Sequence, residues 1–296
     1  MKIKPLNGEK KAALCGLAFV SPWIIGLLAF NLYPILYSLY LSFTSYSLVG
    51  EPKFVGLSNY IRLFTQDSYI AMGVNNTLYF TLLYVPLWFV MGLGFALMMN
   101  QKMRGAKLFR TFAFLPSLVT IAATASVWSW LMNTNMGVFN AVIRQFGFKP
   151  IAWLNSVEYS KLSVLIMALW PVGSVSIIYL VALQSIPQDV MEASYIDGAT
   201  PLRRLFKITL PMISPTIYFN VLISIIAALQ IFAESILLTK GGPANSTMFY
   251  VYYLYKTAFS LMDFGYASAI AWVFFVVVLV FVLIYQRQFS KRVFYQ

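Results

Sequence analysis

Long apolar runs separated by short polar segments make up most of this 296-residue chain. A transmembrane helix needs about 20 consecutive apolar residues. Six runs reach or approach that length, so the pattern predicts an all-α protein that crosses a membrane about six times, at residues 12–43, 77–99, 111–132, 161–183, 212–238 and 265–285. Two shorter segments, 59–64 and 250–264, predict helices that lie at the membrane surface.

Proline and glycine indicate where some of these helices bend. The first run contains Pro22 and Pro34 and exceeds the length of one span, so we expect a tilted or kinked helix. Although lysines precede it, the run is too long for a signal peptide and has no small-residue cleavage site. The fourth run has Pro171 and Gly173 near its middle.

Composition supports a membrane protein and excludes several other classes. Hydrophobic residues make up 60% of the chain and charged residues only 10%, against about 25% charged in soluble domains. The net charge is +12, but the basic residues flank apolar runs instead of forming a patch with aromatics, which argues against nucleic acid. With no histidine and a single cysteine, Cys15, we expect no metal site, no intrachain disulfide and no catalytic site.

The distribution of lysine and arginine predicts the orientation of the chain. With six spans, both termini lie on the same side, and cytoplasmic segments carry the excess of basic residues. Fourteen of the 21 basic residues fall on the side of the termini: Lys2, Lys4, Lys10, Lys11, Lys102, Arg104, Lys107, Arg110, Arg203, Arg204, Lys207, Arg287, Lys291 and Arg292. We therefore expect a multi-pass protein of the cell membrane with both termini in the cytoplasm.

The most polar segment between two spans, residues 185–215, predicts a helix–turn–helix outside the bilayer. Pro187 suits the first turn of a helix, where its missing N–H is not needed. Gly198 suits the left-handed position that ends a helix. Thr200 and Pro201 then suit the cap and first position of a second helix. A hydrophobic protein with such a segment is expected to contact a soluble partner through it.

This segment also carries a family resemblance. Glu192-Ala193-Ser194, Asp197-Gly198-Ala199 and the tail Phe206, Ile208, Leu210-Pro211 and Pro215 resemble the "EAA" loop of ABC importer permeases. Ser194 departs from the pattern, because a second alanine is common there. The resemblance implies a type I ABC importer fold whose coupling helix enters a cleft of a cytoplasmic ATPase. The implied coupling residues are Glu192, Ala193, Ser194, Asp197, Gly198 and Ala199.

Two further stretches resemble carbohydrate permeases of the maltose and glycerol-phosphate type. One contains Phe54, Gly56, Leu57, Asn59 and Tyr60, and the other contains Thr239, Gly241, Gly242, Pro243 and Thr247. The second is similar to the larger permease of a pair and implies that a binding protein docks at Gly241, Gly242 and Pro243. The implied partners are a second, different permease, two ATPase subunits that hold ATP and Mg, and an external binding protein that delivers a carbohydrate, such as an oligosaccharide.

Because the phosphate-loop pattern G-x-x-x-x-G-K-[ST] is absent, we expect this chain to bind no ATP and no other cofactor. Polar side chains within apolar runs are candidates for a solute path, since exposing them to lipid is costly. We identify Asn220, Ser224, Gln230 and Glu234, with each successive pair on one helix face. Hydrogen bonding between helices is the alternative role. For Trp128 and Trp130, the default expectation is an interfacial aromatic belt.

The chain thus divides into a basic tail (1–11), a first helix with an external loop (12–76), a permease core (77–286) that contains the coupling loop (185–211), and a C-terminal tail (287–296). The interpretation is a non-catalytic permease subunit of an ATP-driven carbohydrate importer. Two alternatives stay open: an ABC permease for a non-sugar solute, and an ion-coupled secondary transporter, which would need a buried acidic relay and usually an internal repeat. A purely structural assembly subunit is a third.

Overall fold

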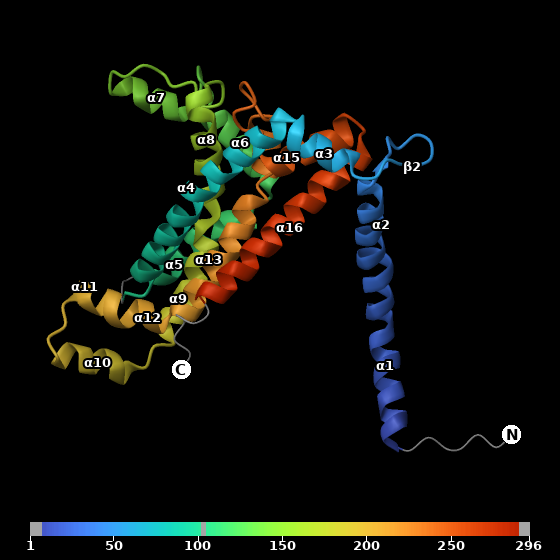
Figure 1. Cartoon of the computed structure of the whole chain (residues 1–296). Coiled ribbons are helices and arrows are strands. Elements are labelled where there is room, and N and C mark those ends of the chain that lie inside the picture. The colour runs from blue at the N-terminus through green and yellow to red at the C-terminus, as the bar shows by residue number, and fades with distance from the viewer. Residues whose placement is uncertain (1–7, 102–104, 290–296) are drawn as a thin grey trace. The chain divides into compact units, whose positions relative to one another are not determined.

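The computed structural model describes residues 8–101 and 105–289, which are mostly helical (Figure 1). Among these residues, four helices are long and apolar enough to cross a membrane, and two sharply bent helix pairs raise the number to six if each pair is one span. This confirms the predicted all-α polytopic fold. Some of the basic residues used for the orientation lie outside the described residues: Lys2, Lys4, Lys102, Arg104, Lys291 and Arg292.

The chain forms two compact units, Met1–Gln66 with Thr257–Val273, and Asp67–Lys256 with Phe274–Gln296. The first unit contains α1 (Gly8–Leu27), a π-helical turn (Leu28–Leu32), α2 (Tyr33–Ser42), β1 (Thr44–Ser45), β2 (Lys53–Phe54), α3 (Ser58–Thr65) and the start of α16 (Phe264–Phe289). The π-helical turn precedes Pro34, whose ring and missing N–H disturb the preceding turn of an α-helix. The predicted kink is therefore a local widening of the helix. Helix α3 confirms the short helix expected at 59–64.

The second unit contains α4 (Ser68–Met99), α5 (Ala106–Phe114), α6 (Ile121–Leu131), α7 (Val138–Gln145), α8 (Val157–Leu169), α9 (Gly173–Gln184), α10 (Gln188–Ile196), α11 (Pro201–Arg204), α12 (Leu210–Met212), α13 (Ser214–Leu229), α14 (Ala233–Leu238), α15 (Tyr250–Tyr255) and the remainder of α16. Helix α4 packs against α8, α9, α13 and α15. Within this unit, α7 and the α10–α12 hairpin lie at opposite ends (Figure 1).

Two buried clusters hold the second unit together. One gathers aromatic residues, including Phe80, Trp128 and Phe249, where α4, α6, α8 and the segment before α15 meet. The other gathers Met99, Tyr179 and their neighbours between α4 and α9. Side chains that are apolar on all sides of a helix are typical of a helix enclosed by other helices or by lipid. The second cluster explains why α4 and α9 pack closely against each other along their length.

The second span begins earlier than the apolar run suggests. We expected a helix from residue 77, but α4 starts at Ser68, where the Asp67 carboxylate accepts a hydrogen bond from the Tyr69 N–H and caps the helix. Asn76 lies inside the helix, and its side-chain amide donates to the carbonyls of Asn245 and Met248. A buried amide that is hydrogen-bonded in this way is tolerated within a helix, so its polarity did not mark a helix end.

The prediction of one continuous third span, 111–132, is wrong. The segment starts at Ala106 and consists of α5, a 3₁₀ turn (Leu115–Leu118) and α6, with a bend of 100° between the two halves. Pro116 lies in the 3₁₀ turn, and Thr120 has extended backbone angles just before α6. Since proline cannot donate to the turn before it, Pro116 weakens the helix where the chain bends.

The predicted fifth span, 212–238, is also interrupted. Helix α13 ends at Leu229, and α14 starts at Ala233. Between them Ile231 packs into the aromatic cluster, and Phe232 leaves the helical conformation. The segment contains neither glycine nor proline, so the break results from packing in the core. This packing cannot be predicted from the local sequence.

The remaining boundaries differ by smaller amounts. The fourth span starts at Val157 and is kinked at the 3₁₀ turn Trp170–Val172, which contains Pro171 and precedes Gly173. The connection before it contains α7, which was not predicted. The segment 250–264 is α15 followed by a π-helical turn (Lys256–Ser260), and the last span is the longer α16.

Candidate functional site

The segment expected to contact a soluble partner folds as a helical hairpin, α10 to α12. Helix α10 starts after Pro187, which serves as its N-cap instead of its first helical residue. At the other end Gly198 has a left-handed φ of 66°, its N–H donates to the Tyr195 carbonyl, and the Ala199 N–H donates to the Ser194 carbonyl. This pair of bonds is a Schellman motif, which ends a helix and turns the chain back.

Two contacts fix the second arm of the hairpin. The Thr200 side chain accepts a hydrogen bond from the Arg203 N–H and caps α11, as its position before Pro201 predicts. The Arg204 guanidinium lies 3.7 Å from the centre of the Tyr195 ring on α10. A cation over an aromatic face is attracted by the ring's quadrupole, so this contact joins the two arms across the turn.

The hairpin exposes the residues of the "EAA" pattern that can make polar contacts. Glu192, Ala193, Asp197 and Gly198 are exposed, and Ala199 is half-buried. Ser194, the departure from the pattern, is buried, and its hydroxyl donates to the Met191 carbonyl. A hydroxyl satisfied within its own helix costs little, so serine fits this position as alanine would.

Sequence reasoning did not anticipate that large apolar side chains surround these polar residues on the hairpin. The exposed ones are Val190, Tyr195, Ile196, Leu202 and Phe206. Ile196 is 87% exposed although it ends a helix in a polar segment. Exposed apolar side chains rimmed by polar residues are typical of surfaces that contact a protein or a membrane. The presence of five large apolar residues within a segment rich in charge is the signal that could have revealed them.

A cavity of about 420 Å³ lies deeper in the second unit, where three interrupted helices meet. Its walls come from the 3₁₀ turn and bend before α6, from the bend between α8 and α9, and from the start of α14. Irregular backbone at membrane depth is tolerated where it is enclosed by protein or lines a cavity. Three interruptions of helices therefore build this cavity, and two of them contain a proline that lines it, Pro116 and Pro171.

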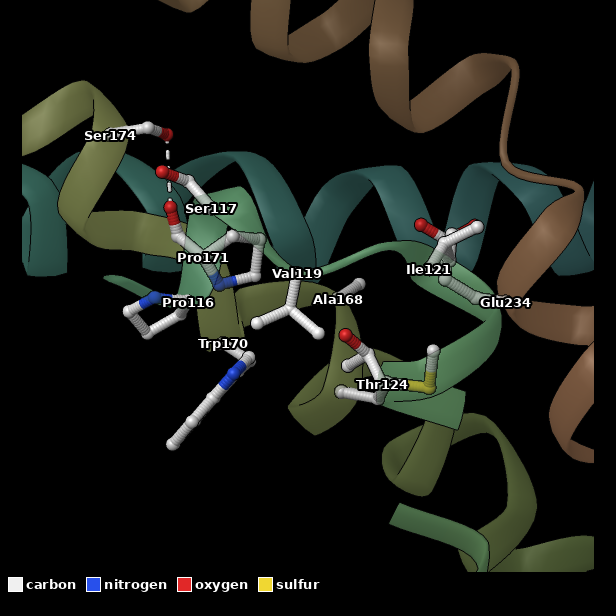
Figure 2. Close-up of a pocket in the computed structure, with 11 residues that line it drawn as sticks. Pro116, Ser117, Val119, Ile121, Thr124, Ala168, Trp170, Pro171, Ser174 and Glu234 are labelled. Carbon is white, nitrogen blue, oxygen red and sulfur yellow. Dashed lines mark hydrogen bonds between the residues drawn. The ribbon is translucent and has the colours of Figure 1, made fainter. Parts of the chain in front are cut away.

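The cavity combines hydroxyl groups, a carboxylate and an indole ring (Figure 2). Ser117, Thr124, Ser174 and Glu234 supply the polar groups, and Trp170 supplies an aromatic face. The Ser174 hydroxyl donates to the Pro171 carbonyl. A mainly apolar pocket with a few convergent polar groups is the usual form of a small-molecule site. Serines that follow a proline by one to three residues within an apolar run were the overlooked signal.

Only one of the four predicted path residues lines this cavity. Glu234 does, whereas Asn220 and Ser224 are buried in α13 and donate to carbonyls of their own helix, Thr216 and Val221. Gln230 is exposed at the end of α13. The predicted pairing of Gln230 with Glu234 on one helix face is wrong, because the chain leaves the helix between them.

The aromatic and glycine-rich candidates have mixed outcomes. The belt expectation is wrong for Trp128, which is only 7% exposed and packs edge-to-face against Trp170, while Trp130 is 57% exposed.

In the loop after α14, Gly241 is buried and Gly242 and Pro243 are half-buried. The Thr247 side chain binds the Gly242 carbonyl and the Thr239 hydroxyl within this loop. The loop is thus a packed element.

No group of three or more His, Cys, Asp or Glu side chains is placed to hold a metal ion within residues 8–101 and 105–289.

Residues 89–295 match the family model of the binding-protein-dependent transport system inner membrane component. The chain belongs to this permease family. The matched range contains the α10–α12 hairpin and all walls of the cavity.

Relatives and solved structures agree with this assignment. The permease is 37% identical to the "Probable ABC transporter permease protein YesP" of Bacillus subtilis (strain 168), over 99% of this chain and 96% of that one. It is 35% identical to the lactose transport system permease protein LacF of Rhizobium radiobacter, over 94% of both chains. A bacterial alginate ABC transporter, solved with an alginate pentasaccharide-bound periplasmic protein, matches with a TM-score of 0.86 and 25% identity over 96% of both chains. The permease is therefore a multi-pass membrane component of an ABC transporter.

Proposed function

We propose that this permease forms the translocation path for a carbohydrate, such as an oligosaccharide, in an ATP-driven importer. The cavity at the three helix breaks carries this proposal. Saccharides offer hydroxyl groups and apolar ring faces, which match the serine and threonine hydroxyls, the Glu234 carboxylate and the Trp170 indole. The names of the lactose and alginate relatives support a carbohydrate over another solute.

The proposed assembly pairs this permease with a second, different permease, two cytoplasmic ATPase subunits and an external binding protein. The α10–α12 hairpin would dock on one ATPase through Glu192 and the exposed apolar side chains around it. ATP and Mg would bind to the ATPase and not to this chain. Both termini would then be cytoplasmic, in agreement with the excess of basic residues on their side. Gly242 and Pro243, in the loop before α15, which lies at the other end of the unit from the hairpin (Figure 1), would face the binding protein.

The proposed mechanism uses the hairpin as a lever. Closure of the ATPase dimer on ATP would move α10, and the Schellman turn with the Arg204–Tyr195 contact would keep α10 and α11 together as they move. Because only Ile213 separates α12 from α13, across a bend of 75°, that movement would reach the helix that precedes Glu234. Rigid-body rocking of packed helices would then open the cavity to alternate sides of the membrane.

Replacing Glu234 with alanine is expected to lower the initial rate of solute uptake about tenfold or more. A hydrogen bond to a charged group contributes about 1.5–3 kcal/mol, and 1.4 kcal/mol corresponds to a factor of ten. The matched control is Glu158→Ala, which removes an exposed carboxylate outside the cavity. Radiolabelled uptake by cells with equal amounts of each variant measures the effect. Equal uptake by the two variants would remove Glu234 from the solute path.

The proposed function is tested by purifying the complex through this permease and measuring ATP hydrolysis. We expect an ATPase to co-purify, and its activity to rise several-fold when a binding protein from the same genome neighbourhood is added with its carbohydrate. A panel of loaded binding proteins identifies the solute. Stimulation only by a non-carbohydrate would support the permease of another solute, and absence of any ATPase would contradict the proposed assembly.

A further inference from the structure

A second cavity, of about 370 Å³ and here called the outer cavity, lies away from the hairpin in the second unit. Its walls come from the end of α6, the turn before α7, the residues just before α8 and the end of α14. Helix α7 lies at the opposite end of the unit from the α10–α12 hairpin (Figure 1), so in the proposed assembly the outer cavity is on the external side. None of the four path residues expected from the sequence lines it.

The walls of the outer cavity are mostly polar. Ser129 and Thr134 contribute hydroxyl groups, and Asn135 and Asn155 contribute amides. None of these four side chains forms a hydrogen bond with another residue in the described part of the chain. Hydroxyl and amide groups can both donate and accept hydrogen bonds. The outer cavity therefore has unused hydrogen-bonding groups of both kinds on its walls.

The turn that carries Thr134 and Asn135 is fixed by other groups. The Arg144 guanidinium donates to the carbonyls of both residues, at 3.0 and 2.9 Å, and the Asn140 amide donates to the Thr134 carbonyl. The Asn133 side chain accepts from the Asn135 N–H. These bonds hold the backbone without using the Thr134 and Asn135 side chains. A ligand would therefore meet a preorganised turn, which lowers the entropy cost of binding.

The outer cavity and the cavity that contains Glu234, here called the inner cavity, follow the same two helices. On α6, Thr124 lines the inner cavity and Ser129 lines the outer one. On α14, Glu234 lines the inner cavity and Leu238 lines the outer one. A rise of 1.5 Å per residue separates the members of each pair by about 6–8 Å along the helix. This arrangement suits a solute built of linked units better than a single sugar ring.

We propose that the outer cavity is an entry subsite for one sugar unit of an oligosaccharide, whose next units reach the inner cavity. The inference rests on the proposed carbohydrate transport and narrows it to solutes of at least two linked sugar units. Sugar hydroxyl groups donate and accept, as the side chains of the outer cavity do. Leu154 and Leu238 supply apolar surface for a ring face, and Lys240 supplies a further donor. The alternative occupant is a loop of the binding protein, because Lys240 directly precedes Gly241.

Uptake of radiolabelled mono- to pentasaccharides of glucose, galactose, arabinose and uronic acids by cells that contain the complete transporter tests this subsite. A neutral hydrogen bond corresponds to about a two- to tenfold change. Asn135→Ala with Asn155→Ala is therefore expected to lower the maximal uptake rate of the longer saccharides about tenfold. A monosaccharide fills one cavity only, so its wild-type rate should be lower and the double variant should leave it unchanged. Asn75→Ala is the matched control, because it removes an exposed amide of α4 outside both cavities and should leave every rate unchanged.

ATP hydrolysis by the purified complex separates a sugar subsite from a docking surface. In the double variant, the concentration of loaded binding protein that gives half-maximal stimulation should stay within about twofold of the wild-type value. A larger increase would assign the outer cavity to the binding protein and overturn the proposal. Unchanged uptake of the longer saccharides, equal losses for mono- and pentasaccharides, or an equal loss in Asn75→Ala would also overturn it. Failure of the proposed function is seen separately, because no carbohydrate would then stimulate the wild-type complex, and this inference would be wrong with it.

Discussion

Replacing Gly198 with proline is expected to lower solute uptake at least about tenfold while the permease still inserts and assembles. Gly198 has a φ of 66° at the end of α10. Proline fixes φ near −65° and has no N–H, so it cannot adopt this conformation or donate to the Tyr195 carbonyl. It also disfavours helical angles at the preceding residue, Asp197. The Schellman turn would be lost, and α10 would no longer lie in a fixed place relative to α11.

The size of this effect follows from the role of the hairpin as the proposed link to the ATPase. Proline in an incompatible helical position costs roughly 3 kcal/mol, and a loss of 1.36 kcal/mol in productive coupling lowers a rate tenfold. Because Gly198 is exposed and a side chain there would meet no other atoms, the cost falls on the turn and not on the core. ATP hydrolysis should continue at its basal rate but lose its stimulation by the loaded binding protein.

The chain offers a matched control in Gly147, which follows α7 at the opposite end of the same unit. Its φ is 79°, its N–H donates to the Arg144 carbonyl, and the Phe148 N–H donates to the Ile143 carbonyl. The same Schellman motif thus occurs away from the hairpin. Gly147→Pro should disturb its local turn to a similar degree and keep coupled ATP hydrolysis. If Gly198→Pro transports at the normal rate, or if both variants lose coupling equally, the lever mechanism is wrong.

The features that the sequence predicts well depend on local chemistry. Apolar runs predict spans because lipid demands about 20 apolar residues, whatever the helix packs against. Gly198 and Thr200 predict the hairpin, because a left-handed residue and an N-cap act within a few residues of the chain. The kink at Pro171 also depends on local chemistry, since proline removes a hydrogen bond from its own helix.

The break between α13 and α14, which brings Glu234 to the cavity, depends on contacts between distant segments. Ile231 leaves the helix to pack with residues of α4, α6 and α8, and neither glycine nor proline announces this. The sequence therefore placed Glu234 on a continuous helix with Asn220 and Gln230, and only Glu234 reaches the cavity. Asn76 is the opposite case, because its polar side chain suggested that a helix starts there, whereas the helix continues through it. Its side-chain amide donates to carbonyls about 170 residues away. In both cases, contacts between distant segments determine whether the helix continues, and these contacts cannot be read from the local sequence.

Replacing Gly173 with alanine is expected to destabilise the permease and to abolish most uptake. Gly173 lies at the bend between α8 and α9, and a methyl group there would overlap the Ala113 carbonyl oxygen of α5. The conflict is with backbone, so no side-chain rotation relieves it and α5 and α9 would have to separate. Overpacking of this kind costs about 1–3 kcal/mol and sometimes more. Trp170 and Ser174 flank the bend and line the proposed solute cavity, so its shape would change with it.

A graded series of glycines distinguishes this mechanism from a general intolerance of the helices to alanine. A methyl group on Gly92 of α4 would lie 2.7 Å from Cγ1 of Val175, a side chain that can shift, whereas one on Gly94 would have no atom within 4 Å. Gly94→Ala should be neutral or stabilising by up to about 1 kcal/mol, because alanine is the better helix former. Thermal unfolding of the purified complex should rank the stability losses as Gly173→Ala, then Gly92→Ala, then Gly94→Ala. A Gly173→Ala variant as stable as Gly94→Ala would show that α5 and α9 do not approach as closely as the bend requires.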